Sequence, residues 1–172
     1  MRLALAVAAI ALLAGCQAMR SGGGAQAVAD LQPTRGNSTS GTISFTQQGG
    51  RVLVSGDVRG LRPNQEHGFH IHEVGDCSSG DGMSTKGHFN PFGKPHSDPG
   101  NTERHAGDMP ALRADASGNA RVNFSIDIIT VEPGSASVVG RGLIVHAAPD
   151  DYKTQPTGNA GARMACAIIS RR

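Results

Sequence analysis

The chain has 172 residues, a length that fits one domain, and its formal net charge of +2 is too small to indicate a nucleic-acid-binding protein. Aromatic residues make up only 3% of the sequence and tryptophan is absent, so a hydrophobic core has to be built mainly from Val, Ile, Leu, Ala and Phe. The 24 glycines are many for a helical protein and suit a chain with many tight turns.

The N-terminal segment has the pattern of an export signal. Arg2 precedes an apolar run, 3–14, which has the length of a signal-peptide core and is too short to span a bilayer. The run ends at Leu13-Ala14-Gly15-Cys16, which resembles a bacterial lipobox and implies cleavage before Cys16 and lipidation of its thiol. The alternative is an ordinary cleaved signal that is followed by an incidental cysteine.

These features divide the chain into three parts. Residues 1–15 are the expected signal peptide, 16–25 the lipidated cysteine with a flexible glycine-rich tether, and 26–172 a single domain. We expect the domain to be exported and periplasmic, with Cys16 anchoring it to the cell envelope. Gln17 stands where an aspartate is associated with inner-membrane retention, which favours the outer membrane.

Beyond the tether, apolar and polar residues alternate with a period of two, which predicts β-strands. Ile43 and Phe45 alternate with polar neighbours, a turn follows at 48–50, and the cleanest alternation covers 121–128. The apolar residues expected on the buried faces of the next strand and of 121–128 are Val52, Val54, Val58, Val122, Phe124, Ile126 and Ile128. The apolar runs 142–148 and 164–170 also have strand length, and no segment has the pattern of an amphipathic helix. Six to eight short strands predict an antiparallel sandwich or barrel.

A pair of histidines lies in a segment that otherwise has the pattern of a strand. His70 and His72 are two residues apart, so their side chains point to the same face. Two imidazoles on one face can bind copper or zinc. The alternative is that both are half-exposed side chains on a solvated strand face.

Further residues that can bind metals follow in 74–108, a segment without a strand pattern that we name the metal loop. It carries His88, His96, His105 and Asp108, and His146 lies in a later apolar run. A loop of 35 residues needs internal contacts to stay ordered, and bound metal ions would supply them. The alternative, a disordered insertion, does not explain why side chains that can bind metals are concentrated there.

Several separate stretches together resemble the copper/zinc superoxide dismutases. They are GFHIHEVGDC at 68–77, GHFNP at 87–91, the spacing from His96 through His105 to Asp108, the run that ends at His146, and GNAGARMAC at 158–166. The resemblance covers about 26–170, with all motifs in order. It implies an all-β fold: an eight-stranded antiparallel Greek-key β-barrel, related to the immunoglobulin-like sandwich, with a long metal-binding loop and a shorter channel loop. We name residues 147–162 the channel loop.

The resemblance also implies one copper and one zinc ion per subunit. Copper would be bound by His70, His72, His88 and His146, and zinc by His88, His96, His105 and Asp108. His88 would thus bridge the two ions. Four imidazole nitrogens suit the tetragonal preference of Cu(II), and three nitrogens with one carboxylate suit a closed, tetrahedral zinc site.

The reaction implied is dismutation of superoxide to dioxygen and hydrogen peroxide, with copper alternately reduced and reoxidised. His88 is expected to supply a proton, and Arg163 to hold the anion beside copper. Thr157 would lie on the other side of the channel, and Lys153 is the only lysine of this segment available to steer superoxide. The alternative for Arg163 is an ordinary surface arginine. An exported dismutase would protect the cell envelope from superoxide.

Asp150 matches a carboxylate that, in the family, links one copper ligand to one zinc ligand. It would accept hydrogen bonds from His70 and His96 and orient both rings. Because Asp151 follows directly, the alternatives are an exposed turn aspartate and an assignment that is displaced by one residue.

The chain has three cysteines, which is an odd number for an exported protein. If Cys16 carries lipid, Cys77 and Cys166 remain, and in an oxidising compartment they should pair. The resemblance implies the same disulfide, which would join the metal loop to the last strand.

Two other classes of function compete with a dismutase. One is a dismutase-like domain that binds or delivers copper or zinc without turnover, and the other is a purely structural domain held by zinc and a disulfide. The expected copper ligands and Arg163 are all present, which favours the enzyme. Superoxide is then the substrate, the membrane is reached only through Cys16, no nucleic acid is expected, and a homodimer remains open.

Overall fold

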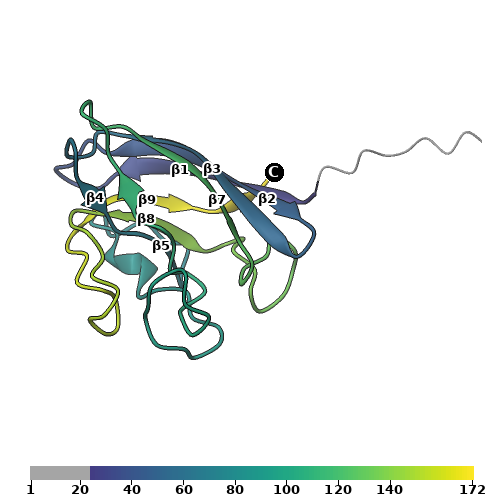
Figure 1. Ribbon diagram of the computed structural model, residues 1–172. Coiled ribbons are helices and arrows are strands. Elements are labelled where there is room, and N and C mark those ends of the chain that lie inside the picture. Colours follow the sequence, from purple (N-terminus) through teal and green to yellow (C-terminus); the bar gives the residue numbers. More distant parts are fainter. Residues whose placement is uncertain (1–23) are drawn as a thin grey trace, which may run out of the picture.

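The computed structural model describes residues 24–172, so the predicted signal peptide and the predicted lipidation site Cys16 lie outside the described residues. Within this range the chain forms ten strands and one short 3₁₀ helix, without an α-helix (Figure 1). No helix of this part of the chain has the length and hydropathy that a membrane crossing requires.

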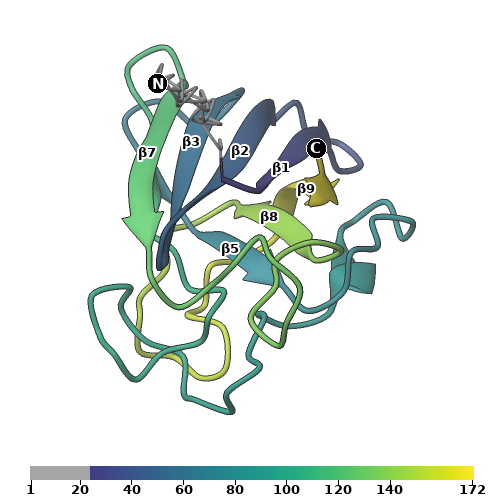
Figure 2. The ribbon, with the colours of Figure 1, turned by 90° about the vertical axis from the view of Figure 1, so that its right-hand side faces the viewer.

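The strands are β1 (Gln26–Pro33), β2 (Ser40–Gln48), β3 (Arg51–Arg59), β4 (Glu66–His67), β5 (Phe69–His72), β6 (Leu112–Arg113), β7 (Ala120–Ile126), β8 (Gly142–His146), β9 (Arg163–Ile168) and β10 (Ser170–Arg171), and the 3₁₀ helix is η1 (Met83–Thr85). The main sheet has the order β5-β8-β9-β1-β2-β3-β7, with β10 beside β1, and β4 pairs with β6. The main sheet curls around one core (Figure 2). Long connections from β3 to β5 and from β7 to β8 give it the antiparallel Greek-key arrangement that we expected.

The main sheet has the expected eight strands, and β4 and β6 form a separate pair; β4, β6 and β10 have only two residues each. Such short pairings have no apolar period that a sequence could reveal. The predicted strand at 121–128 ends at Ile126, and Ile128 packs against the core from the connection that follows. Strand length therefore follows the available pairing partners rather than the apolar period alone.

The alternation predicted for the first hairpin is present in its core. Ile43 and Phe45 on β2 are fully buried, as are Val52 and Val54 on β3. Antiparallel pairing of β2 with β3 and of β3 with β7 aligns Phe45, Val54 and Phe124 across three strands. Burial of these aliphatic and aromatic side chains supplies the main stabilisation of the barrel, about 1.5–3 kcal/mol for each large side chain.

The two long loops extend from the same side of the barrel (Figure 1). The metal loop contains η1 but no strand, and its middle and its C-terminal end are fastened to β5 through backbone hydrogen bonds that involve Ile71, Phe89 and Gly107. The nitrogen of Ile71 donates to the carbonyl of Gly107 at 3.0 Å, and the nitrogen of Phe89 donates to the carbonyl of Ile71 at 2.9 Å. These contacts make the loop an ordered part of the domain rather than a disordered insertion.

A disulfide joins the metal loop to β9. Cys77 and Cys166 are bonded with an S–S distance of 2.02 Å and are 89 residues apart in the sequence, which confirms the expected pair. The crosslink holds the segment before His88 against the strand that carries Arg163.

Replacing both cysteines with serine is expected to lower the free energy of unfolding by about 4–5 kcal/mol on the chain-entropy estimate. We also expect faster zinc release, because the segment after Cys77 leads directly into His88. Urea unfolding and zinc transfer to a chromophoric chelator measure the two effects. Unchanged zinc release from the double variant would show that the crosslink and the metal loop are not coupled.

The two ends of the described chain meet at one end of the barrel. Ala27 on β1 pairs with Arg171 on β10, and the backbone nitrogen of Arg172 donates to the backbone carbonyl of Gln26 at 2.9 Å. Figure 1 shows this end away from the metal loop and the channel loop.

Candidate metal centre

Three of the histidines come from two neighbouring strands. Phe69 and Ile71 on β5 point into the core, so His70 and His72 point to the opposite face. His146 ends β8, which pairs with β5. His70 and His72 are nevertheless 0% exposed, because the loops cover them, so they are not half-exposed surface residues.

The metal loop brings its own side chains to this covered face. Isolated bridges pair His72 with His88 and His70 with Asp108, so the middle of the loop and its C-terminal end lie along β5. The rings of His70 and His88 are 4.0 Å apart between centroids, and those of His88 and His96 are 5.2 Å apart.

Two groups of four side chains result, and they share His88. The first group is His70, His72, His88 and His146, and the second is His88, His96, His105 and Asp108. In each group the potential ligand atoms lie within 4.8 Å of one another, and every member is buried. The geometry therefore brings together all seven side chains that the sequence suggested as metal ligands.

In the first group, each imidazole has one nitrogen without a hydrogen-bond partner. These buried atoms are His70 Nδ1, His72 Nε2, His88 Nε2 and His146 Nε2. The other nitrogen of each ring has a hydrogen-bond partner. The partner is Asp150 for His70 and the carbonyl of Lys86 for His72. It is Asp108 for His88 and the carbonyl of Gly161 for His146. A buried polar atom without a partner costs about 1–3 kcal/mol, and four of them in one place fit a metal ion with four nitrogen ligands, as copper prefers.

In the second group, three imidazole nitrogens surround one carboxylate oxygen. Asp108 Oδ1 lies 2.8 Å from His88 Nδ1, 3.0 Å from His96 Nδ1 and 3.5 Å from His105 Nδ1. The backbone nitrogens of Ser97 and His105 donate hydrogen bonds to Asp108 Oδ2 and fix the carboxylate. Three nitrogens and one oxygen are a donor set that fits tetrahedral zinc.

Burial favours the neutral form of three rings of the first group, those of His72, His88 and His146. It lowers the pKa of His72 well below its usual value, and the neighbouring rings of His88 and His146 lower it further. Burial also lowers the pKa of His146 to about 3 and that of His88 to about 4, although Asp108 partly offsets the effect at His88. Neutral imidazole is the form that binds a metal ion.

The second group favours positive charge. Burial alone would raise the pKa of Asp108, but hydrogen bonds from His105, His88 and His96 hold it well below its usual range. Burial lowers the pKa of His96, but hydrogen bonds to Asp108 and Asp150 outweigh this effect and raise it to about 9. The surroundings of Asp108 therefore stabilise a cation.

Asp150 lies between the two groups. Its Oδ2 is 2.6 Å from His70 Nε2, and its Oδ1 is 2.9 Å from His96 Nε2, so one carboxylate contacts a ring of each group. The pKa of Asp150 would be raised by burial, but the hydrogen bonds from both rings lower it below its usual value. Asp151 is exposed and accepts hydrogen bonds from the backbone of Lys153 and Thr154 instead.

Arg163 begins β9 and is partly buried beside the metal loop, which is not the environment of an ordinary surface arginine. Its Nη1 donates to the carbonyl of Gly82 at 2.6 Å and to Thr85 Oγ1 at 2.8 Å. Its Nη2 donates at 2.6 Å to the carbonyl of Lys86, which also contacts His72 Nδ1 at 2.8 Å. Burial lowers the pKa of Arg163. One backbone oxygen thus links the guanidinium to a ring of the first group.

The two other residues that the sequence suggested for an anion path lie in the channel loop. Thr157 is partly buried and Lys153 is exposed. Their parts in guiding an anion stay predictions. The seventh histidine, His67, is fully buried, and its Nδ1 lies 2.8 Å from the carbonyl of His146, which agrees with a structural role.

Two contacts at the site had no signal in the sequence. The carbonyl of Lys86 is a backbone group, and its direction depends on the positive φ of 62° at that residue. Gln155 is an exposed loop glutamine whose side-chain amide binds the backbone of His96. Neither follows from residue type or spacing.

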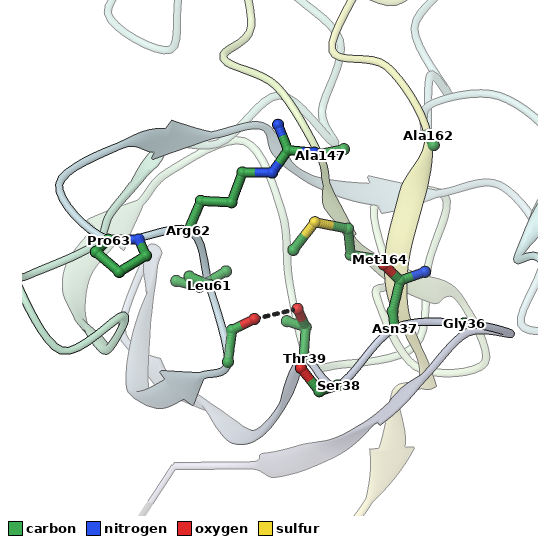
Figure 3. A pocket seen from close by; sticks show the side chains of 11 residues that line it. Gly36, Asn37, Ser38, Thr39, Leu61, Arg62, Pro63, Ala147, Ala162 and Met164 are labelled. Carbon is green, nitrogen blue, oxygen red and sulfur yellow. Dashed lines mark hydrogen bonds between the residues drawn. The ribbon is translucent and has the colours of Figure 1, made fainter.

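A separate hollow of about 550 Å³ is bordered by 36–39, 60–63, Ala147, Ala162 and Met164 (Figure 3). At its edge Thr39 Oγ1 donates to the carbonyl of Gly60 at 2.9 Å. None of the histidines borders this hollow, so it takes no part in the metal centre.

The fold and the two linked groups define a β-barrel protein that can hold two adjacent transition-metal ions. The family model described as copper/zinc superoxide dismutase (SODC) matches residues 39–169. This chain belongs to the copper/zinc superoxide dismutase family.

Individual relatives agree with that assignment. The superoxide dismutase (Cu-Zn) of Paramecium bursaria Chlorella virus 1 is 41% identical over 135 residues, which cover 75% of this chain and 71% of that protein. Superoxide dismutase (Cu-Zn) 2 of Aquifex aeolicus (strain VF5) is 40% identical over 148 residues, which cover 84% of this chain and 86% of that protein. Among solved structures, the clock protein EA4 matches with a TM-score of 0.78 at 39% identity, over 84% of this chain and 93% of that one.

Proposed function

We propose that this protein catalyses the dismutation of superoxide, in which two superoxide anions and two protons give dioxygen and hydrogen peroxide. The observation that carries the proposal is the pair of buried four-residue groups that share His88. Membership of the copper/zinc superoxide dismutase family supports the same activity.

The donor atoms support a different metal for each group. Copper would be bound by His70 Nδ1 and by the Nε2 atoms of His72, His88 and His146, the four nitrogens of this group without a hydrogen-bond partner. Zinc would be bound by the Nδ1 atoms of His88, His96 and His105 with Asp108 Oδ1. The ring of His88 would therefore present one nitrogen to each metal.

When bound, copper supplies a reversible one-electron change, and zinc fixes the shared ring and completes a closed structural site. His88 Nε2 can hold a proton whenever it is not a ligand and can pass it to the reduced substrate. Asp150 accepts hydrogen bonds from His70 and His96, so it keeps both rings in the orientation that the two metals need.

Arg163 provides the binding position for the substrate anion. Within the described residues, three of its five guanidinium N–H groups donate to Gly82, Thr85 and Lys86. The remaining N–H groups can donate to superoxide. Because the three bonds fix the guanidinium, little side-chain entropy is lost when the anion binds.

The proposed place of action is the periplasm, where the enzyme protects the cell envelope from superoxide. Support comes from the apolar run at 3–14 and from the lipobox-like sequence before Cys16, whose thiol would carry the lipid. The disulfide of Cys77 and Cys166 suits an oxidising compartment.

The activity is tested by following superoxide decay with protein that is loaded with copper and zinc and then gel-filtered to remove unbound copper. We expect the loaded protein to accelerate decay strongly and the metal-free protein to have no effect. Equal decay with both would instead identify a copper- and zinc-binding protein without turnover. Metal analysis of each sample shows whether the loading succeeded.

A further inference from the structure

We propose that Gln155 is a positioning residue of the zinc group, because its side-chain amide holds the backbone of His96. The backbone nitrogen of His96 donates to Gln155 Oε1 at 2.9 Å, and Gln155 Nε2 donates to the backbone carbonyl of His96 at 2.8 Å. One amide thus satisfies both backbone groups of a single residue. The inference rests on the proposed function, which assigns His96 to zinc.

His96 needs such support because its part of the metal loop lacks regular pairing. No strand or helix includes His96, and among the described residues its backbone has no hydrogen bond to another backbone group. Gln155 therefore makes the two bonds that a neighbouring strand would make in a sheet. The two residues are 59 positions apart, so the contact joins the channel loop to the metal loop.

The same stretch of the channel loop also fixes the ring of His96. Asp150 Oδ1 lies 2.9 Å from His96 Nε2, which leaves Nδ1 to point toward Asp108. A Cβ atom at Gly158 would collide with Asp150 Oδ1 and with His96 Nε2, so the bare backbone of Gly158 packs directly on that hydrogen bond. Residues 150–158 thus hold both the ring and the backbone of His96.

Glutamine suits this position because its amide carries a donor and an acceptor at the same end. Methionine has a similar length and shape but offers no donor and only a weak acceptor. Because residue 155 is exposed, its replacement leaves the core intact. Gln65 is also exposed, lies on the connection before β4, and provides a matched control.

The test compares wild type, Gln155→Met, Gln155→Ala and Gln65→Met, each as metal-loaded full chain. Zinc transfer to a chromophoric chelator should be about three- to tenfold faster in both Gln155 variants, given the modest net value of two partly exposed hydrogen bonds. Gln65→Met should match wild type. With Co²⁺ in place of zinc, the visible absorption of the Gln155 variants should change, because displacement of His96 alters the ligand geometry.

A Gln155→Met protein with the zinc release and the Co²⁺ spectrum of wild type would overturn the proposal. Superoxide decay, measured on the same wild-type sample, keeps this result separate from the proposed function. A wild-type protein without dismutase activity, combined with faster zinc release from the Gln155 variants, would refute the function and support the positioning role. Normal dismutase activity of wild type, combined with unchanged zinc release from the Gln155 variants, would support the proposed function and refute the positioning role.

Discussion

Replacing His146 with alanine is expected to reduce superoxide decay by about a hundredfold or more while zinc stays bound. His146 belongs only to the group of four imidazoles, and its Nε2 is one of the four nitrogens without a protein partner. Its loss leaves three nitrogens for copper, and even the loss of an outer contact to a metal ligand typically costs 10- to 100-fold in affinity or activity. Metal analysis and superoxide decay on the same samples measure both effects.

The matched control for this variant is His105→Ala. His105 belongs only to the group around Asp108, so its replacement should release zinc and leave copper bound. Opposite metal losses in the two variants would verify the assignment of each group. If His146→Ala retained copper and full activity, the proposed copper site would be wrong.

Replacing Arg163 with glutamate is expected to slow catalysis by about a hundredfold, because reversal of a charge at the substrate position repels an anion whose capture depends on electrostatic attraction. The same change removes three hydrogen bonds to Gly82, Thr85 and Lys86. Superoxide decay as a function of ionic strength measures the effect. The slowing should diminish as salt screens the introduced charge.

Arg163→Lys separates charge from loop support. Lysine keeps the positive charge but cannot reproduce the planar arrangement of donors that binds the loop. We expect an activity between those of wild type and Arg163→Glu, with wild-type copper content in both variants. Activity of Arg163→Glu equal to wild type would show that Arg163 does not bind the substrate.

The residue pattern predicted the barrel where side chains alternate and failed where backbone groups decide the structure. The alternation at Ile43, Phe45, Val52 and Val54 gave the correct buried faces. The two-residue strands β4, β6 and β10 are too short to produce a period, and they form only because neighbouring segments offer hydrogen-bond partners. Antiparallel pairing across long connections depends on contacts that are distant in sequence.

The candidate site was predictable to a similar degree. Histidine spacing identified the side chains that meet at the two groups, since metal binding restricts the residue types at those positions. It could not identify the carbonyl of Lys86, since every residue has a carbonyl. Nor could it identify Gln155, since an exposed glutamine in a loop has no distinctive pattern. Contacts that orient metal ligands through the backbone become visible only in three dimensions.

The pairing of β1 with β10 bears on how this protein can be attached to a solid support. Since Gln26 and Arg172 are hydrogen-bonded neighbours, a linker at either end of the domain leaves from the same place on its surface. That place lies away from the metal loop and the channel loop (Figure 1). A sensor electrode or bead coupled through either terminus would therefore leave the face that carries the metal centre open to the bulk solution.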